Sequence, residues 1–183
     1  MARLWGVLIV ALALTLAGCN SGGNSGGGAA QSGDSGAPLV TDMNQLGMGA
    51  YTVQTTGDVT FAATAAQAVY NRNGDRYEIA FLFTGVPYEV RLLHFGVPAS
   101  GQYPLTQSTN TEPTAENPFS ISLLSLSSPL PADRYLNDIQ GTLNLVTTEF
   151  FISGSFDFTA ASEDGSHHVT VHGIFSQLRV PTE

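Results

Sequence analysis

The chain has 183 residues, a formal net charge of −9 and no lysine. Six arginines against fifteen acidic residues leave no basic surface to neutralise phosphates, which excludes nucleic acid and anionic lipid head groups as expected partners. The single cysteine excludes an intrachain disulfide, so a domain must be stabilised by its apolar core alone. We interpret the acidic excess as a solubilising surface, with binding of cations or basic partners as the alternative.

Residues 1–18 have the layout of a secretory signal. Arg3 provides a positively charged start, and an apolar stretch follows over residues 4–16. This stretch is about 13 residues long, well below the roughly 20 that a helix needs to span a bilayer. The sequence therefore predicts a signal peptide over residues 1–18, cleaved between Gly18 and Cys19.

The order Leu16-Ala17-Gly18-Cys19 resembles the lipobox of bacterial lipoproteins. In that family the cysteine thiol takes a diacylglyceryl group, the leader is removed and the new amino terminus is acylated, for example with palmitate. The resemblance implies that Cys19 is the lipid attachment site and that several acyl chains hold the protein firmly to a membrane. Asn20 stands where aspartate marks inner-membrane retention in many such proteins, so the resemblance implies the outer membrane. The alternative is an ordinary signal peptide with a chance cysteine.

Residues 19–38 are predicted to be a lipidated, flexible linker. Residues 20–37 contain seven glycines and four serines, and so little apolar surface that we expect them to be disordered. The run Gly33-Asp34-Ser35-Gly36 imitates the nucleophile motif of chymotrypsin-like proteases. It precedes the whole domain and lies in this linker, so we reject a catalytic role for it.

Apolar and polar residues alternate with a period of two throughout residues 39–183, which predicts a single all-β domain. Polar residues on the opposite faces indicate antiparallel strands with one side buried. We expect an antiparallel sandwich or a flattened barrel of about eight to eleven strands, and the pattern leaves these two open. The predicted inward-facing sets are Tyr77-Ile79-Phe81-Phe83, Tyr88-Val90-Leu92, Phe119-Ile121-Leu123, Ile139-Leu143-Leu145, Phe150-Ile152-Phe156-Phe158 and Val169-Val171.

Glycines mark several turns and irregularities in this pattern. Asn73-Gly74 favours a type I′ hairpin turn, in which both central residues have positive φ. Asp164-Gly165 is predicted to connect two long C-terminal strands. Gly154 and Gly173 interrupt the apolar alternation, where a bulge or a sharp bend would let strands curl around a core.

The segment Leu105–Pro118 is polar and carries Glu112 and Glu116. A connection of about fourteen residues is long for a compact β domain. We expect it to be either a binding loop or a mobile one, and no aromatic or basic residue in it favours the first.

Three histidines near the C-terminus suggest a metal site at first sight. On a strand, His167 and His168 would point to opposite faces, while His168 and His172 would stand about 13 Å apart on one face. Zinc ligands must converge within about 2 Å of the ion, so His94 would have to join from another strand. We predict no metal site here and interpret these histidines as exposed strand residues.

Asn71, Asn73 and Asp75 resemble the alternating oxygen ligands of a calcium loop. The glycine, however, falls at the fourth position rather than the sixth, and Leu82 occupies the position of the bidentate glutamate. A hairpin turn explains these residues with fewer assumptions.

No catalytic residue or cofactor site is predicted. The sequence lacks a Gly-x-Ser-x-Gly elbow, and its acids fall in predicted turns or beside alternating polar faces. The sixteen phenylalanines and tyrosines could line a cavity in a lipocalin-like barrel, with Phe81, Phe83, Phe156 and Phe158 as lining residues. Aromatic residues at alternate strand positions also fill an ordinary core, which is the interpretation that we prefer.

The C-terminal region carries a second resemblance. It contains Gly141-Thr142-Leu143-x-Leu145, then Ile152-Ser153-Gly154-Ser155-Phe156-x-Phe158-Thr159-Ala160, then Val169-x-Val171-x-Gly173-x-Phe175. This order is similar to the closing strands of uncharacterised bacterial lipoproteins with one all-β domain. The resemblance implies a fold and no activity.

Together these features predict a lipid-anchored protein of the outer membrane that is not an enzyme and acts as a structural or interaction module. The alternatives are a carrier of a small apolar ligand and, last, a hydrolase of envelope polymers. The expected partners are the membrane, through lipid on Cys19, and a protein or a small apolar ligand. The side of the membrane that the domain faces stays open.

Overall fold

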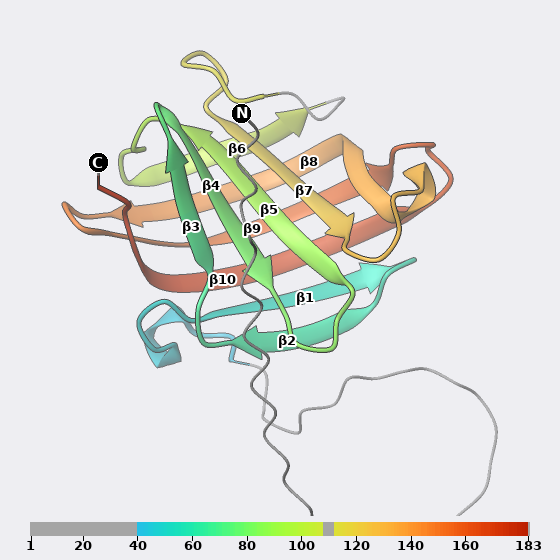
Figure 1. Cartoon of the computed structure of the whole chain (residues 1–183), viewed down its shortest axis with the longest axis horizontal. Helices are drawn as coiled ribbons and strands as arrows, with labels where there is room; N and C mark the ends of the chain where they lie inside the picture. The colour runs from blue at the N-terminus through green and yellow to red at the C-terminus, as the bar shows by residue number, and fades with distance from the viewer. Residues whose placement is uncertain (1–39, 108–111, 183) are drawn as a thin grey trace, which may run out of the picture. The chain divides into compact units, whose positions relative to one another are not determined.

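The computed structural model describes residues 40–107 and 112–182. The predicted signal peptide and linker lie outside this part of the chain. The described residues form ten strands and two short 3-10 turns, which confirms the predicted all-β fold (Figure 1). The elements are η1 (Met43–Gln45), β1 (Tyr51–Gly57), β2 (Phe61–Ala65), β3 (Val69–Asn73), β4 (Arg76–Leu82), β5 (Tyr88–Phe95), β6 (Gly101–Gln107), β7 (Phe119–Ser125), η2 (Pro131–Asp133), β8 (Arg134–Thr147), β9 (Phe151–Ser162) and β10 (His168–Arg179).

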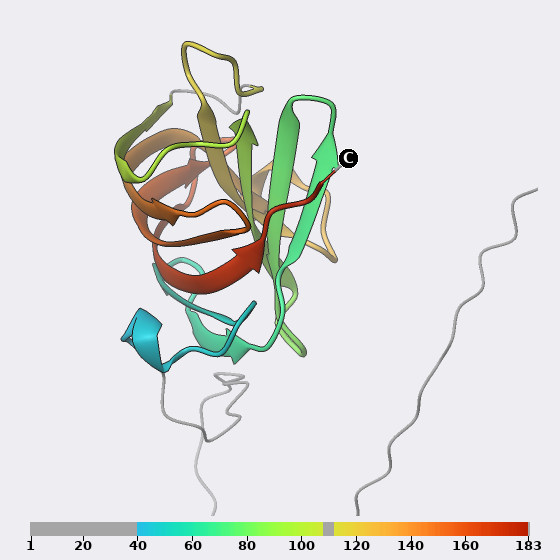
Figure 2. The ribbon, with the colours of Figure 1, turned by 90° about the vertical axis from the view of Figure 1, so that its left-hand side faces the viewer.

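All ten strands belong to one antiparallel sheet. Its order is β2-β1-β10-β9-β8-β7-β5-β4-β3, and β6 pairs with β8 outside this path. The sheet curls so that β3, β4, β5 and β7 lie over β8, β9 and β10, as two perpendicular views show (Figures 1 and 2). The end strands β2 and β3 each pair with a single neighbour, so the sheet is a half-barrel that remains open along one side.

The concave face of the sheet carries the predicted core. Phe81 lies at its centre, with its ring centroid 5.1 Å from that of Tyr51, 5.4 Å from Phe156 and 5.5 Å from Phe175. The predicted inward-facing sets are buried with two departures. Tyr88 is half-buried, and Phe150 is 55% exposed because it belongs to the turn that precedes β9, so the inward phase of that strand begins at Ile152.

Tyr51 connects the two ends of the curled sheet. Its hydroxyl donates a hydrogen bond to the Leu82 carbonyl at the end of β4. Burial raises the pKa of Tyr51 to about 12, which keeps the phenol protonated as a donor.

Tyr51→Phe is therefore expected to lower the free energy of unfolding by about 1 kcal/mol, because it leaves the Leu82 carbonyl without its donor. Urea denaturation monitored by fluorescence or circular dichroism measures this change. Tyr103→Phe is the matched control, since the Tyr103 hydroxyl bonds to the nearby Ala99 carbonyl in an exposed position. Equal losses in the two variants would contradict the role given to Tyr51.

The two predicted hairpin turns have different outcomes. Asn73 pairs with Arg76, so the central residues of the first turn are Gly74 and Asp75, and only Gly74 has a positive φ, at 62°. The predicted type I′ turn is therefore wrong. The Asp164-Gly165 turn does connect β9 to β10. Hydrogen bonds from Ser162 and Ser166 lower the pKa of the Asp164 carboxyl to about 2.

Gly154 and Gly173 are not bulge positions. Gly173 pairs with Phe156, and Gly154 pairs with Phe175, without a shift of register. The reason for glycine is close approach, because a Cβ built on Gly173 would lie 2.2 Å from Cζ of Phe156. Similarly, a Cβ built on Gly154 would lie 2.8 Å from Cζ of Phe175. Each aromatic ring thus covers the glycine on the neighbouring strand.

The predicted loop over Leu105–Pro118 begins later than expected. Strand β6 continues to Gln107, and Leu105 is buried in the core with 2% exposure. Residues 108–111 lie outside the described part. Beyond them, Glu112 forms an ion pair with Arg76 at 3.0 Å.

Candidate functional site

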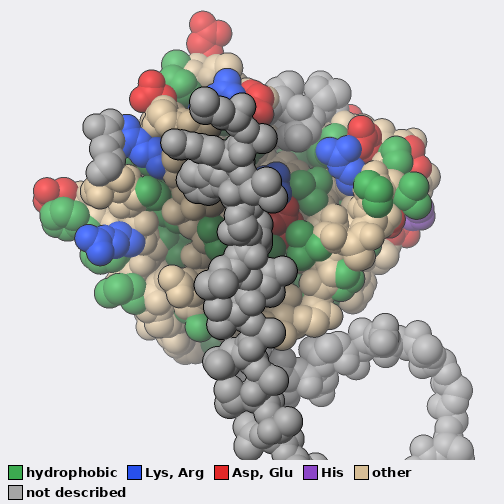
Figure 3. Space-filling view, in the orientation of Figure 1, with side chains coloured by type: hydrophobic (Ala, Val, Ile, Leu, Met, Phe, Trp, Pro, Cys, Tyr) green, Lys and Arg blue, Asp and Glu red, His purple; other side chains and the backbone are tan. Residues whose placement is uncertain are grey.

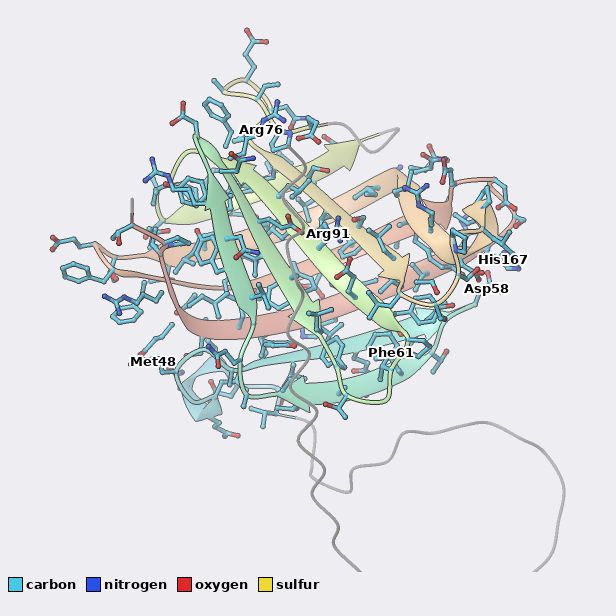
Figure 4. The ribbon with its side chains drawn as sticks, viewed as in Figure 1. Met48, Asp58, Phe61, Arg76, Arg91 and His167 are labelled. Carbon is cyan, nitrogen blue, oxygen red and sulfur yellow. The ribbon has the colours of Figure 1, made fainter. Side chains whose placement is uncertain are left out.

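A groove lies on the open side of the half-barrel, where the edge strand β3 faces the end of β10. We call it the seam groove. It has a volume of about 620 Å³ and is lined by residues from four segments of the chain, among them Met48, Ala68, Tyr70, Phe150, Leu178 and Arg179. The groove lies at the left-hand edge of the molecule in Figure 3, where hydrophobic and basic side chains meet. Figure 4 labels Met48 at the same edge. The groove is thus mainly apolar with a few polar groups.

Two large apolar side chains at the rim are open to solvent. Met48 is 66% exposed and Phe150 is 55% exposed, whereas Leu178 on the groove floor is 2% exposed. Met48 follows η1, and Phe150 lies in the β8–β9 turn, so separate parts of the chain contribute to one surface. Exposed apolar side chains that adjoin a groove are typical of a binding surface.

A bulge in β10 shapes the groove. Phe175 pairs with Gly154, and the next pair is Leu178 with Ile152, so β10 has one extra residue in this interval. Gln177 has a φ of 49°, which is uncommon for a residue with a side chain. The bulge reverses the alternation, because Leu178 now turns into the core and Arg179 turns outward.

Arg179 differs from three other arginines of the domain in its surroundings. Arg76, Arg91 and Arg134 form ion pairs with Glu112, Glu78 and Glu89, and Glu163 respectively. Arg179 has no acidic partner among residues 40–107 and 112–182. A guanidinium beside an apolar groove, with no carboxylate bound to it in the described part of the chain, is available for an external anion.

The half-buried Tyr70, which lines the groove, is paired with the buried His94 behind it. The Tyr70 hydroxyl lies 2.8 Å from Nε2 of His94, and Nδ1 of His94 lies 2.7 Å from the Gly96 carbonyl. A carbonyl only accepts, so Nδ1 carries the proton and Nε2 accepts the hydrogen bond from Tyr70. The His94 ring also stacks on Tyr77, with centroids 4.8 Å apart. This pair fixes one tautomer of His94 and orients Tyr70 at the groove.

Burial keeps this pair neutral. His94 has no exposed surface, and desolvation lowers its pKa to about 4, although the hydrogen bond to Gly96 acts in the opposite direction. Desolvation and the neighbouring Tyr77 raise the pKa of Tyr70. Both ring nitrogens of His94 are used by the protein. The pair is therefore a structural support for the groove wall and offers no free base to a ligand.

A second polar cluster lies on the outer face of β4 and β5. Nε of Arg91 lies 3.1 Å from Oε1 of Glu78, and its Nη2 pairs with Glu89 (Figure 4 labels Arg91). Ser122 pairs with Arg91 in the sheet register. The guanidinium separates two carboxylates that would otherwise repel each other, so the cluster stabilises the pairing of these strands.

The predicted site residues fall in different places. Gly18 and Cys19 lie outside the described residues, as does the Gly33-Asp34-Ser35-Gly36 run. His168 and His172 are exposed in β10, where Nδ1 of His172 donates to Asp157, while His167 precedes the strand. The described residues hold no group of three metal-ligating side chains. Asn71, Asn73 and Asp75 belong to the β3–β4 hairpin.

The four phenylalanines considered as a cavity lining pack into the core instead. Phe81 contacts Phe156, Phe156 contacts Phe158, and Phe83 contacts Tyr51 with centroids 5.2 Å apart. The seam groove is lined by other residues. A ligand of this domain would therefore use its open side rather than the space between these rings.

Comparison with known proteins gives no match to a family model, a curated protein or a solved structure. Within the described part, no helix has the length and apolar character to cross a membrane. Sequence reasoning did not identify the seam groove or the Tyr70–His94 pair. The alternation of Val90 and Leu92 continues to His94, and this signal predicts an inward-facing histidine.

Proposed function

We propose that this chain is a lipid-anchored protein of the bacterial outer membrane whose β domain is a non-enzymatic interaction module. The anchor rests on one observation, the order Leu16-Ala17-Gly18-Cys19 directly after a signal-like leader. The chain has one thiol, and it stands where the lipobox places the acceptor of the diacylglyceryl group. Asn20, next to it, supports the outer membrane.

The seam groove supports the role of an interaction module. It combines a volume of about 620 Å³ with exposed apolar side chains and an arginine that has no acidic partner among the described residues. These are properties of a binding surface. Support for an enzyme is weaker, because His94 is buried with both nitrogens bonded and Arg91 pairs with two of the glutamates.

The carrier is the second candidate function. A curled antiparallel sheet is the architecture that carriers of small apolar ligands use, but the rings of Phe81 and Phe156 occupy the core. A carrier built on this domain would hold its ligand in the seam groove. A hydrolase of envelope polymers has the least support among the described residues.

Cys19→Ser is expected to abolish lipid attachment and membrane retention, because an alcohol replaces the nucleophilic thiol. The measurement is the intact mass of the protein from its own membrane, together with its distribution between membrane and soluble fractions. Ser21→Ala changes the same tract without touching the thiol, and we expect it to behave as the wild type. A wild-type protein with an unmodified Cys19 would overturn the proposed anchor.

A further inference from the structure

We propose that the seam groove binds a long-chain fatty acid, with the acyl chain along the apolar surface and the carboxylate on Arg179. This inference rests on the second candidate function, the carrier of a small apolar ligand, and names the class of that ligand. It rests on the size of the groove, the distribution of apolar side chains along it, and the isolated positive charge at one side.

The groove has the dimensions and lining of a small-molecule site. Its volume of about 620 Å³ falls within the range of roughly 300–1,000 Å³ that is typical of ligand pockets. Leu178 forms part of the floor, and Met48 and Phe150 stand exposed at the rim. An acyl chain laid over this floor would remove apolar surface of Met48 and Phe150 from water, together with its own, which favours binding.

Charge complementarity selects the head group. Arg179 is exposed and has no acidic partner within the described residues, whereas a carboxylate matches the two parallel donors of a guanidinium. The β10 bulge holds Arg179 outward, and its neighbour Leu178 points to the core, so charge and apolar floor are adjacent. One positive charge beside an apolar groove is complementary to one negative charge at the end of an apolar chain.

The net charge of the protein restricts the ligand further. At −9, the domain repels ligands that carry several negative charges, and a single guanidinium does not offset this field. A neutral apolar chain would gain nothing from Arg179. A monocarboxylate with one apolar chain carries the single negative charge that Arg179 can bind and avoids the repulsion that several negative charges would meet.

Photoaffinity labelling tests this proposal on the full mature protein. The protein is purified from its own membrane, reconstituted in phosphatidylcholine nanodiscs and irradiated with a diazirine analogue of palmitate, and the labelled peptides are mapped by mass spectrometry. We expect labels near Met48, Phe150 and Leu178. Excess palmitate should displace the label, and hexadecanol should displace it about tenfold less well, because it lacks the charge.

Arg179→Gln supplies the decisive variant. We expect it to weaken labelling by palmitate about tenfold and to remove the preference for palmitate over hexadecanol. Arg76→Gln is the matched control, because Arg76 lies elsewhere on the molecule and pairs with Glu112 (Figure 4). Labels spread over the surface, equal effects of the two substitutions, or displacement by an apolar peptide alone would overturn the proposal. The same mass spectra show whether Cys19 carries acyl groups. The proposed lipid attachment is therefore tested separately from the proposed binding of a fatty acid.

Discussion

Replacing Gly173 with valine is expected to lower the free energy of unfolding by about 3 kcal/mol or more, because the new side chain overlaps the Phe156 ring. The overlap begins at Cβ, which would lie 2.2 Å from Cζ and 2.4 Å from Cε2 of that ring. Phe156 has no exposed surface and also contacts Phe81 and Phe158, so it has no room to move away.

Thermal unfolding followed by circular dichroism measures this effect. A loss of this size corresponds to a fall in Tm of roughly 6–12 °C for a domain of this length. Gly47→Ala is the control, because a Cβ at Gly47 meets nothing within 4 Å, and we expect its Tm to stay close to that of the wild type. An unchanged Tm in Gly173→Val would show that the ring does not constrain this position.

A double substitution identifies the partner ring. In Gly173→Ala with Phe156→Leu, the smaller side chain gives space to the added methyl group. The double variant should therefore lose less stability than the sum of the two single variants. Strict additivity would place the strain somewhere other than at Phe156.

Stability is expected to fall by about 3 kcal/mol as the pH drops from about 6.5 to about 4, because His94 is neutral in the folded protein. In the unfolded chain this histidine takes up a proton near pH 6.5, whereas in the folded state its pKa is about 4. Between these values the unfolded state binds one proton more, so acid favours unfolding. The contribution is fully present above pH 6.5 and is lost as the pH falls toward 4.

Urea titrations at a series of pH values measure this slope. His94→Gln removes the titrating group and should flatten the profile in this window, even if the variant is less stable at neutral pH. His172→Gln provides the comparison, because His172 is exposed and pairs with Asp157. The rings that face His94 are those of Tyr70, Tyr77 and Phe119. An unchanged slope in His94→Gln would assign the acid sensitivity to other groups.

The sequence predicted the features that depend on local alternation. Phe156 and Phe158 are inward because polar residues alternate with them, and no knowledge of the partner strands is needed. Phe150 departs because a turn shifts the start of its strand, and the length of a turn depends on how two strands pair.

The candidate site depends on relations between distant segments. Arg179 would face the core if β10 continued its alternation from Phe175, and it faces outward because of a bulge that appears only in the register with β9. The role of Gly173 likewise follows from the ring of Phe156 on the neighbouring strand. The seam groove brings together Met48, Phe150 and Leu178, whose proximity follows from the curl of the whole sheet.

The pairing of β1 with β10 has a consequence for the order of folding during synthesis. Tyr51 lies opposite Phe175, so the first strand of the domain waits for the last one to emerge before it gains its central neighbour. Such long-range pairing makes folding slow, because a large loop must close before the contact forms. The sheet around β1 is therefore incomplete until β10 has been synthesised.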